Sequence, residues 1–292
     1  MPMRHDRFAV FILTYGRPGR VVTLNSLRRQ RYSGPVYLVV STDDPTVEEY
    51  RRRYGNESVL VFDKAEVEKA FDTADNFQER RAVIYARNAA FGFARELGLE
   101  SFLELDDDYT LFRYAITPDG NFCRDIPIGD LDRLFDAFLD GLAMMPDRVL
   151  TVCMAQTGDY IGQRIGRPFR WRDGLLRKAM NTFFLRTDRP FSFVGKVNED
   201  VNTYVELGKR GYVLLTVPMV AIKQKPTQSN AGGMTGLYLD NGTYVKSAYT
   251  VMFNPSAVRV GLMGAVHKRV HHNISWDYAV PRIVPERFRV LA

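Results

Sequence analysis

Three consecutive carboxylates, Asp106, Asp107 and Asp108, follow the mainly apolar segment 102–105 in the sequence FLELDDDY. Adjacent anions repel one another, and a carboxylate is costly to bury without a partner. A turn or a helix N-cap would account for one aspartate, but three in a row after a strand are harder to explain in that way. Hard divalent cations such as Mg²⁺ and Mn²⁺ prefer carboxylate oxygens, so this cluster predicts a metal site.

Arg87 is the second residue that could take part in chemistry. In the predicted helix QERRAVIYARNAAFGFAREL its neighbours one turn away are Val83, Ile84, Ala90 and Phe91. All four are apolar, so Arg87 lies on the face that packs against the sheet. A guanidinium in that position needs a carboxylate or phosphate partner. Pairing with one of the aspartates and contact with a ligand phosphate or base both stay open.

Two further groups combine residue types that are suited to catalysis or metal binding. Asn198, Glu199 and Asp200 begin a predicted helix, where Asn could cap the helix and the acids could complement its dipole. Three histidines lie within six residues: His267, His271 and His272. A zinc site would need more Cys or His ligands nearby, and packing against an aromatic residue is an alternative.

The segment QRIGRPFRWRDGLLRK, residues 163–178, combines cations with aromatic side chains. Its cations include four arginines that we assign to DNA binding together with Trp171: Arg164, Arg167, Arg170 and Arg172. Basic residues interleaved with aromatics contact phosphates and stack on bases in nucleic-acid grooves. A charged surface hairpin is the alternative.

The charge of the chain is divided unevenly between its halves. Residues 1–150 contain 20 Lys+Arg and 25 Asp+Glu, whereas residues 151–292 contain 20 and 9. A basic half beside an acidic half suggests two tasks, one of which could be to hold a polyanion. A solvated basic surface would give the same balance.

Strand-like and helix-like segments alternate in the first half and must position these side chains. Strands are predicted at 8–13, 36–40, 58–62 and 101–105, and helices at 21–30, 46–54 and 78–97. This alternation predicts an α/β fold with a mostly parallel sheet. Ligands of such sheets bind beyond the carboxyl ends of the strands. Polar clusters follow three of the strands, so Thr14, Tyr15, Arg17 and Asp43 are expected near the aspartates, where a nucleoside would bind.

The second half is less regular. Strands are predicted at 149–155, 180–185 and 212–218, and a helix at 197–211. We see no internal repeat or linker, so the chain is expected to form one continuous catalytic domain. The sequence has neither G-x-G-x-x-G nor G-x-x-x-x-G-K-[ST]. The negative charge of a diphosphate would therefore be neutralised by a metal that the aspartates hold.

Cysteine content and hydropathy limit the class of protein. Cys123 and Cys153 are too few for a disulfide framework or a thiolate metal cage, which favours a reducing compartment. The apolar run at 8–13 is shorter than the ~7–15 residues of a signal-peptide core. No run approaches the ~20 apolar residues of a membrane span. A soluble cytoplasmic protein is expected.

The sequence LELDDDY resembles the D-x-D motif of GT-A-fold glycosyltransferases, which holds a divalent cation against the diphosphate of a sugar nucleotide. The resemblance implies that Asp106 and Asp108 bind the metal and that Asp107 and Arg87 belong to the nucleotide-sugar site. Inverting GT-A enzymes carry an acidic pair at the start of a helix below the acceptor. This implies Asp200 as the general base, with Glu199 as the second choice. GT-A enzymes often add a C-terminal histidine as a metal or diphosphate ligand, which implies His271 or His272.

The motifs FILTYGRPGRV, STDD, YARN, ELDDDY, NED and QSNAGG, in that order, resemble the phage TET-associated glycosyltransferases over roughly residues 8–275. That family is thought to glycosylate hydroxymethylated pyrimidines in DNA. The resemblance implies a GT-A-like, Rossmann-like α/β fold that uses Mn²⁺ or Mg²⁺. It also implies a nucleotide-sugar-binding half at 1–150 and an acceptor-binding half at 151–292 within the one catalytic domain.

The expected reaction is transfer of a hexose from a UDP-linked sugar, such as UDP-glucose, to 5-hydroxymethylcytosine in double-stranded DNA. The enzyme would act in the host cytoplasm if it is phage-encoded, without a membrane or an obligate protein partner. Two alternatives stay open: a GT-A enzyme with a polysaccharide or other non-DNA acceptor, and a non-catalytic DNA-binding module on a degenerate transferase fold. The intact aspartate triplet argues against the second.

Overall fold

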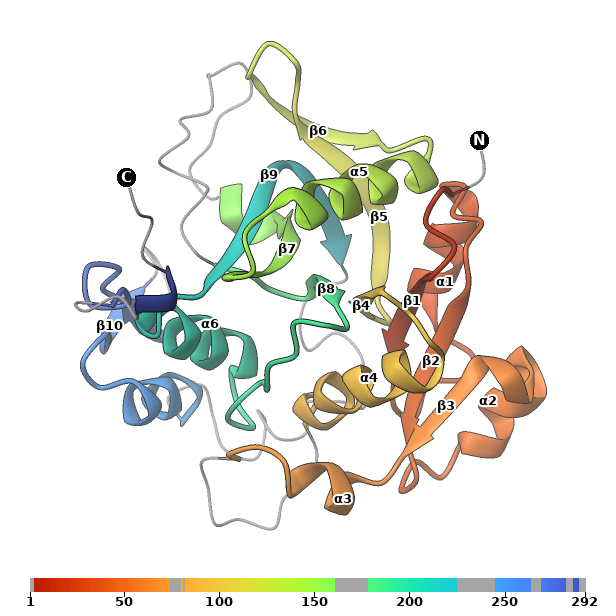
Figure 1. Ribbon diagram of the computed structural model, residues 1–292, viewed down its shortest axis with the longest axis horizontal. Coiled ribbons are helices and arrows are strands. Elements are labelled where there is room, and N and C mark those ends of the chain that lie inside the picture. The colour runs from red at the N-terminus through yellow and green to blue at the C-terminus, as the bar shows by residue number, and fades with distance from the viewer. Residues whose placement is uncertain are drawn as a thin grey trace.

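Most of the structure is organised around one large β-sheet (Figure 1). The computed structural model describes residues 3–73, 80, 82–160, 178–224, 245–263, 269–281 and 286–288. In these residues a nine-stranded sheet has the order β3-β2-β1-β4-β8-β7-β9-β5-β6, and β10 and β11 form a separate hairpin. The sheet takes strands from both halves of the chain.

The first half forms the parallel part of the sheet. Its strands are β1 (Phe8–Leu13), β2 (Val36–Ser41), β3 (Val59–Phe62) and β4 (Ser101–Asp106). The connecting helices are α1 (Val22–Arg29), α2 (Val47–Tyr54), α3 (Lys64–Glu68) and α4 (Ile84–Glu96), with a 3-10 turn at Asn56–Ser58. All four predicted strands are confirmed. The helix predicted at 78–97 begins at Ile84, and α3 was not predicted.

The chain after β4 adds the remaining elements. Its strands are β5 (Tyr109–Ile116), β6 (Phe122–Pro127), β7 (Val149–Gln156), β8 (Thr182–Arg186), β9 (Val213–Gln224), β10 (Val258–Met263) and β11 (Arg269–Ile274). Its helices are α5 (Leu131–Met144), α6 (Glu199–Lys209) and residues 245–253, with 3-10 turns at Thr157–Tyr160 and Glu286–Phe288. Strands β5 and β6 and helix α5 had no counterpart in the prediction.

Two apolar cores lie on opposite faces of the sheet. One is formed by strand residues with α1, α2 and α5, and includes Leu24, Tyr50 and Phe135. The other is formed with α4 and α6, and includes Phe91 and Tyr204. Because both faces are covered, every residue of β1 is buried. Figure 1 shows α4 and α6 along the sheet, with α5 beside β5 and β7.

Strand direction confirms the predicted fold class. Strands β3, β2, β1 and β4 are parallel neighbours, and the parallel pair β7–β9 runs the same way as they do. Only β8 and β5 among the nine strands of the described sheet run in the opposite direction. The fold is therefore an α/β architecture with a mostly parallel central sheet flanked by helices.

The parallel register brings the predicted polar clusters to one edge. Leu13 of β1 lies opposite Val39 of β2 and Asp106 of β4, so the residues that follow these three strands share the carboxyl edge of the sheet. That edge is where a ligand of a parallel sheet is expected.

Candidate active site at the carboxyl edge of the sheet

A buried guanidinium joins three carboxylates that come from different parts of the chain. Arg87 of α4 is 1% exposed. Its Nη1 lies 3.4 Å from Glu104 Oε2, its Nη2 lies 3.1 Å from Asp106 Oδ1, and its Nε lies 3.2 Å from Glu199 Oε1. Arg87 thus pairs with carboxylates in this structure, and its contact with the nucleotide sugar stays a prediction. The rings of Phe183 and Phe193 lie 5.0 and 5.7 Å from the guanidinium carbon.

The pKa values at this cluster report an excess of negative charge. Burial raises the pKa of Glu104 to about 8, against the opposing effect of Arg87. Burial and the neighbouring Asp200 raise the pKa of Glu199 to about 7. Burial also raises the pKa of Asp106. Although burial acts to lower the pKa of Arg87, the charges of Asp106, Glu199 and Glu104 raise it above its ordinary value. One guanidinium does not neutralise all the carboxylates around it.

Asp107 connects the aspartate cluster to the loop after β1. Its Oδ2 accepts a hydrogen bond from Thr14 Oγ1 at 2.7 Å, and its Oδ1 lies 3.0 Å from Arg17 Nη1. The Tyr50 hydroxyl lies 2.8 Å from Thr14 Oγ1 and accepts a hydrogen bond from the Arg17 backbone N–H at 2.8 Å. The structure therefore brings together Thr14, Arg17 and Asp107, all of which were predicted to bind the nucleotide sugar. In this structure Asp107 serves to hold the loop.

Asp108 is the member of the triplet with no ion pair among the described residues. Burial, followed by the charges of Asp106 and Asp107, raises its pKa to about 7. No group of three or more His, Cys, Asp or Glu side chains in the described part of the chain is arranged to hold a metal. Mg²⁺ and Mn²⁺ do not need such a cage, because Mg²⁺ usually binds one or two carboxylates together with water and substrate phosphates. Asp106 and Asp108 fit a cation bound in that way, and their role as its ligands stays a prediction.

Tyr15 and Asp43 meet at the carboxyl ends of β1 and β2, where they were expected. The Tyr15 hydroxyl donates to the Asp43 carbonyl oxygen at 3.4 Å. Lys64, at the start of α3, lies 3.0 Å from Asp43 Oδ2 and has its Nζ 4.7 Å from the centre of the Tyr15 ring. Ser41 Oγ also donates to the Asp43 carboxylate. An aromatic ring, a carboxylate and an ammonium group thus lie beside one another at this end of the site.

The acidic pair at the start of α6 has two different environments. Glu199 is paired with Arg87, whereas Asp200 Oδ1 accepts a hydrogen bond from the Val201 backbone N–H at 2.7 Å and makes no ion pair within the described residues. Both side chains are 7% exposed. Asn198 does not cap the helix with its side chain; its Nδ2 donates to Lys246 O and to Thr250 Oγ1, both at 2.8 Å. Of these two acids, Arg87 pairs with Glu199 only, and Asp200 has no counter-charge from it.

His271 and His272 lie on β11, opposite Gly261 and Val260 of β10. Their rings stack with centroids 4.5 Å apart. Burial, His271 and two lysines lower the pKa of His272 to about 4, and no described residue hydrogen-bonds to its buried Nδ1. Neither imidazole joins the aspartates in a three-ligand group. Their predicted role as metal ligands stays a prediction.

The DNA-binding prediction falls outside the described residues. It rests on Arg164, Arg167, Arg170, Trp171 and Arg172, and the structure describes none of residues 161–177. His267 and the QSNAGG motif are outside the described residues as well.

Sequence reasoning missed two charged residues of this edge. Lys64 is the second residue after β3, so the rule that selected the polar residues after the other strands would have found it. Glu104 is 0% exposed inside β4, where it faces α4 from a mainly apolar run. A lone carboxylate within a buried strand, opposite a lone arginine on the packed face of a helix, was the available signal.

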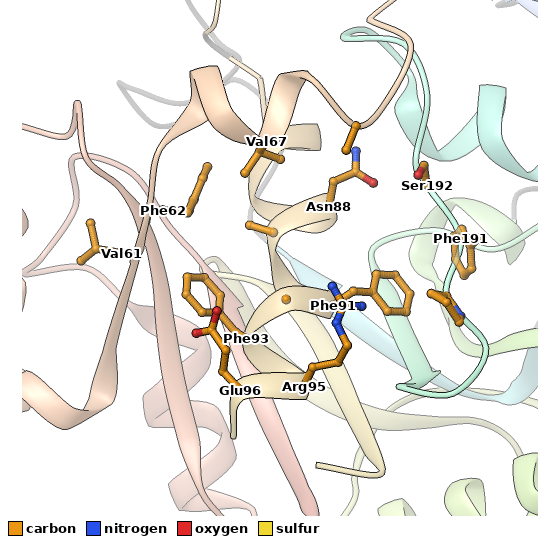
Figure 2. Close-up of a pocket in the computed structure, with 14 residues that line it drawn as sticks. Val61, Phe62, Val67, Asn88, Phe91, Phe93, Arg95, Glu96, Phe191 and Ser192 are labelled. Carbon is orange, nitrogen blue, oxygen red and sulfur yellow. The ribbon is translucent and has the colours of Figure 1, made fainter. Parts of the chain in front are cut away.

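A separate groove of about 540 Å³ lies along α4, away from these carboxylates. Figure 2 shows its lining side chains, which include Val67, Asn88, Arg95 and Phe191. None of its lining residues is a predicted site residue. In the described residues, no helix is both long enough and apolar enough to span a membrane.

Comparisons with known proteins add a family assignment. A family model described as TET-Associated Glycosyltransferase matches residues 8–233. No curated protein matches the sequence. Among solved structures, a mannosyltransferase from Pyrobaculum calidifontis in complex with GDP-Man and Mn²⁺ is 14% identical with a TM-score of 0.45, covering 87% of this chain and 77% of that chain. Glucosyl-3-phosphoglycerate synthase from Mycobacterium tuberculosis with Mg²⁺ and UDP is 11% identical with a TM-score of 0.42, covering 91% and 87%.

Proposed function

Because the chain belongs to the TET-associated glycosyltransferase family and is therefore a glycosyltransferase, we propose that it transfers a hexose to hydroxymethylated DNA. The donor is a nucleotide sugar, UDP-linked, and the acceptor is the hydroxyl of a hydroxymethylated pyrimidine, 5-hydroxymethylcytosine. The family description, TET-Associated Glycosyltransferase, supports a DNA acceptor.

The observation that carries the catalytic part of this proposal is the charge imbalance at the carboxyl edge. Arg87 is the guanidinium shared by Glu104, Asp106 and Glu199, while Asp108 and Asp200 have no ion pair within the described residues. Buried anions without counter-charges are costly, so a cation is expected at this edge.

Asp106 and Asp108 would hold that cation, which is Mn²⁺ or Mg²⁺. When bound, it supplies positive charge beside the diphosphate that leaves during the reaction. The chain needs such help because it has no glycine-rich phosphate-binding motif.

The residues at the ends of β1 and β2 would hold the nucleoside of the donor. Tyr15 offers an aromatic face, Asp43 a hydrogen-bond acceptor and Lys64 a donor. The Asp107 contacts with Thr14 and Arg17 fix the loop that carries Tyr15. This arrangement supports a donor site across the parallel half of the sheet.

Asp200 would remove the proton from the acceptor hydroxyl. A general base needs a free acceptor oxygen and a fixed position. Asp200 has both, because it lies buried in the first turn of α6 and its neighbour Glu199 is held by Arg87. The acceptor half, residues 151–292, carries 20 Lys+Arg against 9 Asp+Glu, a balance that suits a DNA polyanion.

Release of nucleoside diphosphate tests this proposal. Purified protein with Mn²⁺ is given a panel of nucleotide sugars in the presence of one of three acceptors. These are a duplex containing 5-hydroxymethylcytosine, the same duplex with unmodified cytosine, and a hydroxyl-rich polysaccharide. We expect release above background only with the hydroxymethylated duplex, and fastest from a UDP-sugar.

Equal release with both duplexes would show that the hydroxymethyl group is not the acceptor. Release that is stimulated by the polysaccharide alone would replace DNA by a carbohydrate acceptor and leave the transferase chemistry standing.

A further inference from the structure

Two glutamine side chains at the carboxyl edge have buried polar atoms with no partner. The Nε2 of Gln156 and the Oε1 of Gln224 make no hydrogen bond to any residue that the structure describes. Leaving a buried donor or acceptor unsatisfied costs about 1–3 kcal/mol per group. Native structures seldom retain such a cost without a ligand or a functional reason.

The strand register places both glutamines on one face. Gln156 ends β7 and lies opposite Ile222 of the parallel strand β9, and Gln224 ends β9 two residues later. Side chains two residues apart in a strand share a face, so Gln224 lies on the same side as Ile222 and Gln156. Two residues of strand span roughly 7 Å, a distance that one planar ring can bridge between two amides.

The glutamine pair, Gln156 and Gln224, also lies next to the candidate catalytic edge. Gln224 is opposite Tyr109 of β5, and Tyr109 directly follows Asp108. Both glutamines are half-buried, so each side chain keeps some contact with solvent at the end of its strand. A group bound by these amides would therefore lie beside Asp108.

One other unsatisfied polar atom in the described residues lies at the opposite edge of the sheet. Thr187 Oγ1 is buried and has no partner among the described residues. Thr187 follows β8, which runs opposite to β4. Its backbone N–H donates to Glu100 O at 2.9 Å. That contact places Thr187 at the amino edge of the sheet, far from the aspartates. Thr187 is thus a matched control for the glutamine pair.

We propose that Gln156 and Gln224 bind the hydrogen-bonding edge of the acceptor pyrimidine and set which base is glycosylated; this rests on the function proposed above. A carboxamide offers a donor and an acceptor, and the edge of a pyrimidine presents the complementary groups. An enzyme that modifies a base takes it out of the stack and recognises it by such hydrogen bonds. The 5-hydroxymethyl group of a base held there would face the carboxylate edge.

The test replaces each glutamine by methionine, which has a similar length and no amide. Wild type, Gln156→Met, Gln224→Met and the double variant are assayed at saturating donor with duplexes containing 5-hydroxymethylcytosine or 5-hydroxymethyluracil. Hydrolysis of the nucleotide sugar without acceptor is measured in parallel, and thermal melting reports folding. Thr187→Val is the control.

We expect each methionine variant to lower acceptor kcat/KM about 10–100-fold, the range for losing hydrogen bonds that a polar site makes to its substrate. Donor hydrolysis should stay unchanged, and Thr187→Val should match wild type in every assay. Gln156→Glu replaces the unpartnered Nε2 donor by an acceptor oxygen, so it should change the ratio of activity on the two bases. That change would not follow from a merely structural role.

Two results would overturn the inference. The first would leave the proposed function standing, and the second would overturn the proposed function as well. If wild type glycosylates the hydroxymethylated duplex and the double variant keeps the same acceptor kcat/KM and base preference, the glutamine pair does not read the base, while the proposed function stands. If wild type modifies no DNA and glycosylates a carbohydrate instead, both proposals are wrong.

Discussion

The Nε atom of Arg87 lies 3.2 Å from Oε1 of Glu199, although 112 residues separate the two in the sequence. The same guanidinium contacts Asp106 at the end of β4. One buried side chain on α4 thus fixes the acidic turn of α6 relative to the aspartate cluster. In the proposed reaction these are the sites of the acceptor base and of the cation, so Arg87 would set the spacing between them.

Replacing Arg87 by methionine should destabilise the protein. The change leaves buried carboxylates without their cation, which costs about 3–5 kcal/mol. Urea unfolding measures the loss. Arg95→Met on the same helix is the control, because Arg95 is exposed and its replacement should change stability by less than about 0.5 kcal/mol. Equal unfolding midpoints for Arg87→Met and wild type would show that the cluster contributes no stability.

Asp108→Asn should remove metal-dependent activity. The amide keeps the size of the side chain and removes its charge from the hard-cation site. We expect a loss of about 10²–10³-fold, because a catalytic metal contributes several kcal/mol and each 1.36 kcal/mol is tenfold in rate. Asp119→Asn, in the exposed turn between β5 and β6, should keep full activity. Undiminished turnover by Asp108→Asn with Mn²⁺, or by wild type in excess chelator, would refute the metal role.

Asp200→Asn should lower kcat by about 10²–10⁴-fold, the usual scale for loss of a general base. Donor binding, measured by calorimetry with UDP, should remain intact because, within the described residues, no hydrogen bond or ion pair joins Asp200 to the β1 and β2 loops that carry the predicted nucleoside site. Glu199→Gln is the comparison, since it weakens the Arg87 contact without removing the proposed base. A normal rate for Asp200→Asn together with a large loss for Glu199→Gln would move the role to Glu199.

The arginines of the basic segment should release counterions when duplex DNA binds. Replacing Arg164, Arg167, Arg170 and Arg172 together by alanine should weaken binding and flatten its salt dependence. Each lost phosphate contact should remove about 0.9 from the slope of log K against log salt. Fluorescence anisotropy from low to moderate salt measures that slope. Identical affinity and slope in wild type and the quadruple variant would exclude this segment from the DNA-binding surface.

Local sequence patterns predicted the parallel half of the sheet well. Apolar runs identified β1, β2, β3 and β4, and the polar clusters after β1, β2 and β4 predicted that Asp43 lies near the aspartate triplet. The β9 prediction stopped at Pro218, since proline cannot donate to a ladder. In the structure the register jumps from Val217 to Ala221, so Pro218 lies in an irregularity and the strand continues to Gln224.

Contacts between distant segments could not be predicted from spacing. The apolar face around Arg87 indicated a buried arginine, but its partner Glu199 comes from α6. The chain reverses within Asp107 and Asp108 to begin β5, without the glycine or asparagine that usually signals a tight turn. That reversal brings Tyr109 opposite Gln224. The position of the glutamine pair beside Asp108 therefore depends on the fold and could not be predicted from the sequence.

Mass spectrometry of nucleosides from treated DNA tests the central claim most directly. A duplex containing 5-hydroxymethylcytosine is incubated with wild-type protein, Mn²⁺ and UDP-glucose, then digested to nucleosides. We predict that 5-hydroxymethyl-2′-deoxycytidine gains the mass of one hexose less one water, and that the product is absent with chelator and with Asp108→Asn. A hydroxymethylated nucleoside of unchanged mass with every nucleotide sugar of the donor panel, from protein that is folded and binds UDP, would contradict transfer to DNA.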